Sequence, residues 1–219
     1  MRWRIGLVDS GGPWQAAVAS ARFANDGRRM DTIVADPTGH GERVAALIRA
    51  AEPGHELLIA QVFDSAGPTT AAAVVAGIEW CRNNGAQLLH LSLGLGVDRP
   101  ALAAVIERTL QAGCLVVAAT PARGPVVYPA AYPGVIRATG DARCAVDELS
   151  RLDPVTFGGC VRPVPAGPAS AGRGASVGAA AVTGTLLTVV NPGCTLAQAL
   201  AALGLRVRYS GPEQRSAPA

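Results

Sequence analysis

The chain has 219 residues, enough for one domain with a sizeable buried core, and because only 4% of them are aromatic, Ala, Val and Leu must fill that core. Its 19 basic residues are all Arg, they are scattered along the chain, and the formal net charge is only +3. This charge pattern argues against nucleic acid as a partner.

Short runs rich in Leu and β-branched residues predict buried strands, and helical patterns lie between several of them. In chain order, the predicted strands cover residues 5–8, 32–35, 57–62, 88–91, 115–119 and 135–139. The predicted helices cover residues 43–51, 69–82, 101–111, 176–190 and 195–203. This alternation predicts an α/β fold: a single domain with a mostly parallel central sheet flanked by helices.

Two regions lack such patterns. Pro and Gly crowd residues 153–174, which we expect to form a loop, and residues 211–219 are polar and predict a disordered C-terminal tail after a domain of residues 1–210. Met1 leads directly into the first strand without room for a signal peptide, and no apolar stretch is long enough to span a bilayer comfortably. We therefore expect a cytoplasmic protein that does not contact membranes.

The cysteines and carboxylates show no metal-binding pattern. Five cysteines occur without a C-x-x-C pair, so we interpret them as reduced and mostly buried thiols: Cys81, Cys114, Cys144, Cys160 and Cys194. The carboxylates do not cluster at calcium-ligand spacing. The sequence thus predicts neither a metal nor another cofactor.

Three segments place a reactive side chain at the edge of an element: GLVDSGG with Asp9, DPTGHGERVAALI with His40 and GRGASVGAAAVTG with Ser176. A serine hydroxyl becomes a nucleophile when an imidazole takes its proton and a carboxylate orients that imidazole. Taken singly, each residue has a plainer interpretation, as a turn residue or a helix-start residue. His55 is expected in a loop, and His90, on a buried strand, as a core histidine with hydrogen-bond partners.

The order Asp9, His40, Ser176 and the residues around them resemble the subtilisin family of serine peptidases. Three further segments resemble family motifs: LLHLSLG at 88–94, YPAAYPGVIRATG at 128–140 and VVNPGCTLAQAL at 189–200. The resemblance covers roughly residues 4–205. It implies the subtilisin-like three-layer fold and a serine endopeptidase in which Asp9 orients His40, and His40 activates Ser176 to form an acyl-enzyme.

The resemblance also implies a binding groove for a peptide or protein substrate. The backbone of Ser92, Leu93 and Gly94 would hold the substrate as an added strand and form one wall of the pocket for the side chain preceding the cut. Val127 falls where many family members have Gly at the floor of the pocket for the residue preceding the cut. A branched side chain there predicts a narrow pocket.

The chain departs from the family pattern at two positions of the oxyanion hole. The segment AATPARG puts Ala122 where the family carries an Asn donor, and Ala175 stands where the family usually has Thr. Thr120 and Arg123 are candidates to replace the lost donor. The sequence leaves three hypotheses open: a slow, selective endopeptidase such as one that processes a precursor peptide, a pseudoprotease that binds peptides or acts as a partner subunit, and a transferase of acyl groups to amines.

Overall fold

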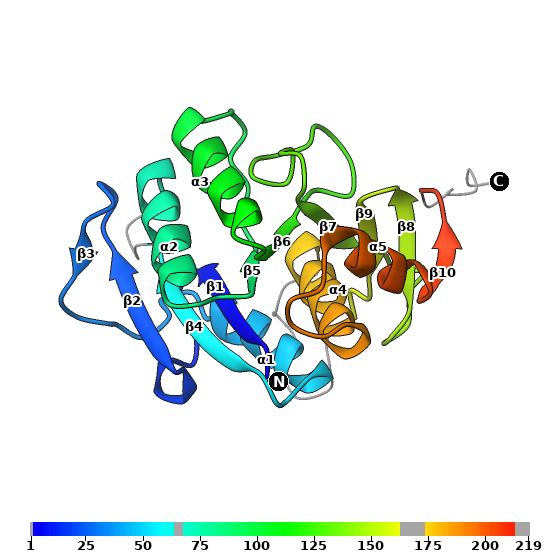
Figure 1. Cartoon of the computed structure of the whole chain (residues 1–219), viewed down its shortest axis with the longest axis horizontal. Coiled ribbons are helices and arrows are strands. Elements are labelled where there is room, and N and C mark those ends of the chain that lie inside the picture. Colours follow the sequence, from blue (N-terminus) through cyan, green and yellow to red (C-terminus); the bar gives the residue numbers. More distant parts are fainter. Residues whose placement is uncertain (1, 64–67, 163–173, 213–219) are drawn as a thin grey trace.

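The computed structural model describes residues 2–63, 68–162 and 174–212. Within them, ten strands form one sheet in the order β10-β8-β9-β7-β6-β5-β1-β4-β2-β3 (Figure 1). The strands are β1 Arg4–Asp9, β2 Ala19–Phe23, β3 Arg29–Met30, β4 Glu56–Gln61, β5 Leu88–Leu91, β6 Leu115–Ala119, β7 Ile136–Gly140, β8 Leu149–Asp153, β9 Thr156–Gly159 and β10 Val207–Ser210. The α-helices are α1 His40–Ala51, α2 Ala71–Asn83, α3 Pro100–Gln111, α4 Ala175–Val189 and α5 Leu196–Gly204.

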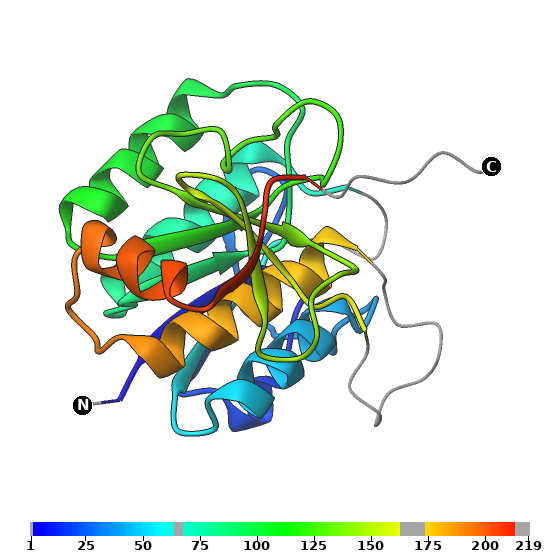
Figure 2. The ribbon, with the colours of Figure 1, turned by 90° about the vertical axis from the view of Figure 1, so that its right-hand side faces the viewer.

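The helices cover both faces of the sheet. Side chains of α1, α4 and α5 pack in one hydrophobic cluster with one face, and those of α2 and α3 pack in a second cluster with the other. Figure 2 shows α1 and α4 on one side of the strands and α2 and α3 on the opposite side. This arrangement confirms the predicted three-layer α/β fold.

Several helices begin at residues that satisfy or remove a free backbone N–H. The Thr70 hydroxyl accepts from the N–H of Ala73 at the start of α2, and Thr195 forms a reciprocal pair with Gln198 at the start of α5. Pro100 opens α3, where its missing N–H costs nothing. These local signals explain why the predicted helices are confirmed to within a few residues.

The strand order places a topological switch at β1. This strand pairs in parallel with β4 on one side and β5 on the other. The chain enters β4 through α1 on one face and leaves it through α2 on the opposite face. Ligand sites in open α/β sheets lie outside the carboxyl ends of the strands at such a point, where Asp9 ends β1.

A close backbone contact holds the start of α4 at the carboxyl edge of the sheet. A side chain on Gly178 would collide with the carbonyl oxygen of Thr139 and the backbone of Gly140, at the end of β7. Farther along α4, Gly184 lies against Ala51 of α1. The absence of side chains at both glycines lets α4 pack tightly on the sheet and on α1.

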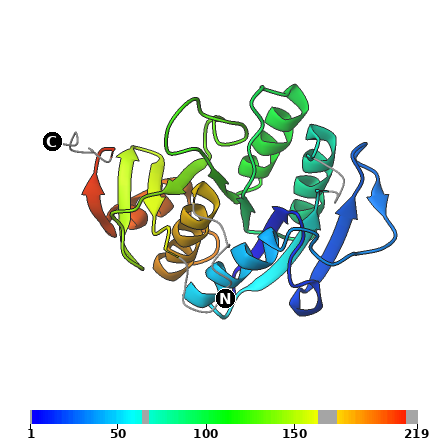
Figure 3. The ribbon, with the colours of Figure 1, turned by 180° about the vertical axis from the view of Figure 1, so that it is seen from behind.

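The prediction of a strand at 32–35 is wrong. Those residues form no strand, and Thr32, Val34 and Ala35 are exposed. The place beside β4 is taken by β2, which the sequence did not indicate and which continues into an antiparallel pairing with the short β3 at the sheet edge (Figure 3). Burial selects β2 because it puts Ala21 and Phe23 into the core.

The loop predicted at 153–174 is wrong in its first part. Residues up to 159 belong to an antiparallel hairpin of β8 and β9, and β10, also missed, extends the sheet beyond β8. Gly158 and Gly159 resemble loop residues, but Ser150 and Gly178 approach them too closely for any side chain. Residues 163–173 of the predicted loop and 213–219 of the predicted tail lie outside the described part of the chain.

The five cysteines are free thiols, as predicted. Four are buried and Cys194 is half-buried. Burial raises the pKa of Cys81 and raises that of Cys114 to about 12. None of the helices in the described ranges has the length and apolar character needed to cross a bilayer.

Candidate active site

Asp9 and His40 form a direct hydrogen-bonded pair. Asp9 ends β1 and is 2% exposed, whereas His40 begins α1 and keeps part of its ring open to solvent. The His40 Nδ1 lies 2.7 Å from Asp9 Oδ1. Because a carboxylate only accepts, Nδ1 carries the shared proton, which leaves Nε2 unprotonated in the neutral ring. The pair thus presents a base at the edge of the sheet.

A second carboxylate, Asp36, shapes the loop that delivers His40. The Ser10 hydroxyl donates to Asp36 Oδ1 at 2.8 Å, and the Ser10 N–H donates to Asp9 Oδ1 at 2.7 Å. The N–H groups of Thr38 and Glu42 donate to the two oxygens of Asp36. Sequence analysis missed this network, although Asp-Pro-Thr just before GHG has the composition of a side-chain-capped turn.

These contacts shift two pKa values. The hydrogen bond to Asp9 raises the pKa of His40, and it outweighs the opposing effect of burial. Burial by itself raises the pKa of Asp36, but the hydrogen bonds from Ser10 and from backbone N–H groups lower it on balance. The site therefore holds two carboxylates beside one imidazole whose protonated form is stabilised.

Ser176 is the second residue of α4 and is half-buried. Gly178 is the first residue of this helix whose N–H bonds back along it, to the Gly174 carbonyl, so the N–H groups of residues 175–177 have no acceptor within the helix. Such a helix end stabilises negative charge. Among the described residues, no hydrogen bond joins the Ser176 hydroxyl to His40. The structure thus brings Asp9 and His40 into contact and places Ser176 on the helix packed beside α1.

The predicted substrate-binding residues follow β5. Ser92 is half-buried, Leu93 is buried and Gly94 is exposed. Two hydrogen bonds, of 2.7 and 2.9 Å, join the next residue, Leu95, to Tyr128. This pairing presses the Val127 side chain onto Gly94, where it fills the space that a side chain on Gly94 would need. The structure therefore brings together Gly94 and Val127, which the sequence assigned to one pocket.

The residues predicted around the oxyanion hole lie on two segments, the chain after β6 and the start of α4. Thr120 is buried at the end of β6, and its N–H donates to the Ala138 carbonyl, so that N–H has a partner already. Ala122 and Arg123 are exposed in the following loop. Ala175 opens α4 and is half-buried.

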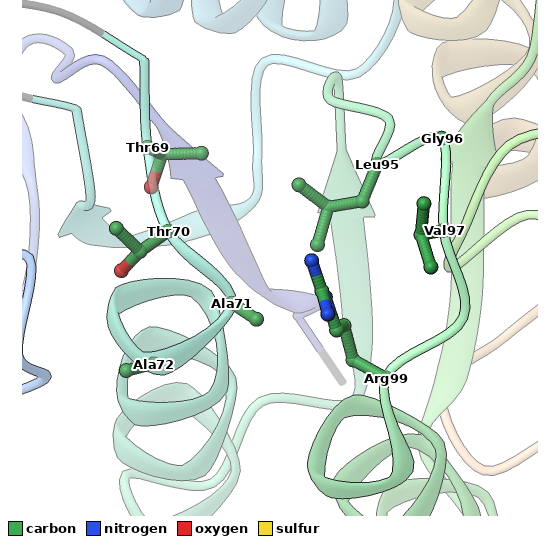
Figure 4. Close-up of a pocket in the computed structure, with 8 residues that line it drawn as sticks. All are labelled: Thr69, Thr70, Ala71, Ala72, Leu95, Gly96, Val97 and Arg99. Atoms are coloured by element: carbon green, nitrogen blue, oxygen red, sulfur yellow. The ribbon is translucent and has the colours of Figure 1, made fainter.

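A cleft of about 500 Å³ continues from the binding segment, between the start of α2 and the loop after Gly94. Figure 4 shows the Arg99 side chain extending toward Leu95, across the cleft from Thr69 and Thr70. The Arg99 side chain makes no hydrogen bond or ion pair with another residue of the described ranges. The Arg99 guanidinium is thus available to interact with a ligand bound along the segment after β5.

The two remaining histidines lie where the sequence predicted. His55 lies in the turn between α1 and β4 and interacts through Nδ1 with the Glu52 carbonyl. His90 is fully buried on β5, and both of its ring nitrogens have hydrogen-bond partners. Within the described ranges, neither makes a hydrogen bond or ion pair with Asp9 or His40.

Comparison with known proteins identifies the family of this chain. The sequence model of the subtilase family matches residues 5–195, most of the chain. The chain belongs to the subtilase family. Subtilisin DY of Bacillus licheniformis is 30% identical over 152 residues, which are 61% of this chain and 54% of subtilisin DY. A thermostable alkaline protease of Halalkalibacterium halodurans is 35% identical over 124 residues, 52% of this chain and 33% of that protein.

Solved structures show the same fold at low sequence identity. A cold-adapted subtilisin-like serine proteinase superposes with a TM-score of 0.70 at 18% identity, covering 90% of this chain and 79% of the other. The self-cleaved protease domain of PatA gives 0.62 at 19% identity, covering 85% and 79%. This subtilase spans about half the length of subtilisin DY, which it matches over 54%.

We expect His40 of this subtilase to titrate above its ordinary pKa of 6.5, and Asp9→Asn to lower that midpoint, because the bond to Asp9 is the main cause of the shift. A raised folded pKa means that the protonated pair stabilises the fold below the unfolded pKa, and that this stability is lost as pH rises through the folded pKa. An NMR titration of the imidazole protons measures the midpoint. His40→Gln identifies the resonance, and His55 is an internal control. An unchanged midpoint in Asp9→Asn would contradict the assignment.

Proposed function

We propose that this subtilase is a serine endopeptidase that cleaves peptide or protein substrates through Asp9, His40 and Ser176. The observation that carries the proposal is the hydrogen-bonded pair of buried Asp9 and half-buried His40 at the carboxyl edge of the sheet, where α4 presents Ser176 at its start. This is the combination that converts a hydroxyl into a nucleophile.

Each group then has a defined role. Nε2 of His40 takes the proton of the Ser176 hydroxyl while Ser176 Oγ bonds to the scissile carbonyl carbon. Asp9 accepts from Nδ1 and stabilises the imidazolium. His40 next passes the proton to the leaving amine, which leaves an acyl group on Ser176 for water to hydrolyse. The N–H of Ser176, which has no acceptor within its helix, is positioned to donate to the developing oxyanion.

Substrate selection belongs to the segment after β5. A peptide bound as an extra strand along Ser92, Leu93 and Gly94 would have its backbone fixed by hydrogen bonds. Val127 would limit the side chain that precedes the cut, because it already packs on Gly94. Farther along, the cleft with Arg99 would face another substrate residue.

The altered oxyanion loop supports slow and selective cleavage. Ala122 offers no side-chain donor, and the N–H of Thr120 is bound to Ala138. Processing of a precursor peptide inside the cytoplasm fits such an enzyme, because selectivity there matters more than turnover. The same loop favours the second candidate, a pseudoprotease that binds peptides or serves as a partner subunit.

Labelling with a fluorophosphonate separates the two candidates. We expect an adduct on Ser176 in the native protein, no adduct in Ser176→Ala or His40→Ala, and normal labelling of Ser210→Ala, an exposed serine on β10. Peptide cleavage should be abolished in both single variants, and the double variant should be scarcely worse, because the triad acts as a unit. Mass spectrometry locates the adduct. A native protein that folds but is not labelled supports the pseudoprotease.

We expect Val127→Gly to widen the pocket for the residue preceding the cut. The native protein should prefer Ala, Ser or Gly there, with discrimination of about 1 to 3 kcal/mol per additional methylene. Val127→Gly should accept Leu and Phe with a gain in kcat/KM, while Val126→Gly, a change at the exposed neighbour, should not. A peptide library reports both profiles. A native preference for Phe or Tyr would refute the narrow pocket.

We expect Ala122→Asn to raise kcat about tenfold, or roughly 1.4 kcal/mol, with little change in KM, because the new amide would bind charge present only in the transition state. Steady-state kinetics with chemistry rate-limiting measure the gain. Arg123→Ala is the companion variant. If Arg123 is the present donor, its loss should lower kcat strongly in the native protein and weakly in Ala122→Asn. An unchanged kcat in Ala122→Asn and in Arg123→Ala would mean that neither side chain reaches the oxyanion.

A further inference from the structure

His90 connects two parts of the site that the triad does not join. It lies on β5 with no exposed surface. Its Nδ1 is 2.8 Å from the Thr183 hydroxyl of α4, and its Nε2 is 2.7 Å from the Ser92 hydroxyl. Thr183 is also fully buried and stands on the helix that carries Ser176. The imidazole thus bridges the nucleophile helix and the first residue of the substrate-binding segment.

The neutral form of His90 requires a donor on one side of the ring and an acceptor on the other. Burial, with a contribution from nearby His40, lowers the pKa of His90 to about 3, so the ring is neutral under ordinary conditions. A neutral imidazole donates from one nitrogen and accepts at the other, so one hydroxyl must accept and the other must donate. Within the described residues, neither hydroxyl has another hydrogen-bond partner. Losing either bond would leave a buried polar nitrogen unsatisfied, which is costly.

We infer that His90 is a positioning residue that holds Ser92, and with it the peptide-binding segment Ser92–Gly94, in register with α4. The inference rests on the proposed function for its consequence in substrate binding. Any fully buried imidazole needs hydrogen-bond partners on both nitrogens; what distinguishes His90 is that its two partners belong to the binding segment and to the catalytic helix. Disturbing the far end of the bridge should therefore weaken peptide binding without touching peptide or triad.

Thr183→Val is the primary test, because it removes the hydroxyl, keeps the side-chain volume and lies at the end of the bridge remote from the peptide. We expect KM for an extended peptide to rise about fivefold, a typical effect of one lost hydrogen bond, with kcat changed less than twofold. Thr183→Ser retains the hydroxyl and should restore the native KM. Thr109→Val is the matched control, since Thr109 is equally buried but bonds only to the Val105 carbonyl in α3.

A double-mutant cycle tests whether the effect passes through His90. Ser92→Ala removes the other end of the bridge, so Thr183→Val should add little to the KM of that variant. Independent, additive increases would overturn the inference, as would equal losses in Thr183→Val and Thr109→Val. If Thr183→Val does not fold, Thr183→Ala removes the same hydroxyl within an Ala-rich helix.

A measurement without substrate separates this inference from the proposed function. Amide hydrogen exchange at residues 92–94 of the free protein should be about fivefold faster in Thr183→Val than in the native protein or Thr109→Val. Unchanged exchange there overturns the positioning role. If native Ser176 is not labelled by the fluorophosphonate but exchange responds as expected, the proposed catalysis fails and the positioning role stands.

Discussion

The backbone contact between α4 and the end of β7 sets the geometry of the site. With Gly at 178, the helix approaches Thr139 and Gly140 so closely that even one methyl group could not be inserted. Ser176 lies two residues earlier, on the first turn, so the contact fixes its height above the sheet edge. The small residues that follow, Ala179 and Ala180, are fully buried and let the rest of the helix pack equally close to the sheet. A larger residue at 178 would lift the serine away from the edge where Asp9 and His40 meet.

Around that edge, hydrogen bonds offset the cost of burying a carboxylate. Asp9 Oδ1 accepts from His40 and from the Ser10 N–H, whereas Asp9 Oδ2 is buried without a partner among the described residues. Ser10 in turn reaches Asp36, which orders the turn before His40. The proposed base is thus held by a network that extends one layer behind it, and its orientation depends on residues that never meet substrate.

Local sequence patterns were sufficient to predict most of the helices and strands. The central strands β1, β4, β5 and β6 are apolar on both faces and β7 on one, so all five could be predicted to within about one residue from their apolar runs. The edges could not be predicted, because β2 and β8 are partly exposed and Gly158 and Gly159 owe their presence to packing against distant segments. At the site, motif order indicated Asp9, His40 and Ser176. Asp36 and the bridging role of His90 depend on contacts across 26 and 93 positions of the chain, which no local pattern encodes.

The buried thiols have a practical consequence. Cys81 lies against Gly6 of the central strand, and Cys114 lies at the foot of β6, and burial keeps both protonated. The thiolate is the form of cysteine that reacts with alkylating reagents. Neither sulfur therefore reacts at a useful rate while the protein is folded and both thiols are buried. The rate at which these two thiols are alkylated would therefore report how often the central strands unfold locally.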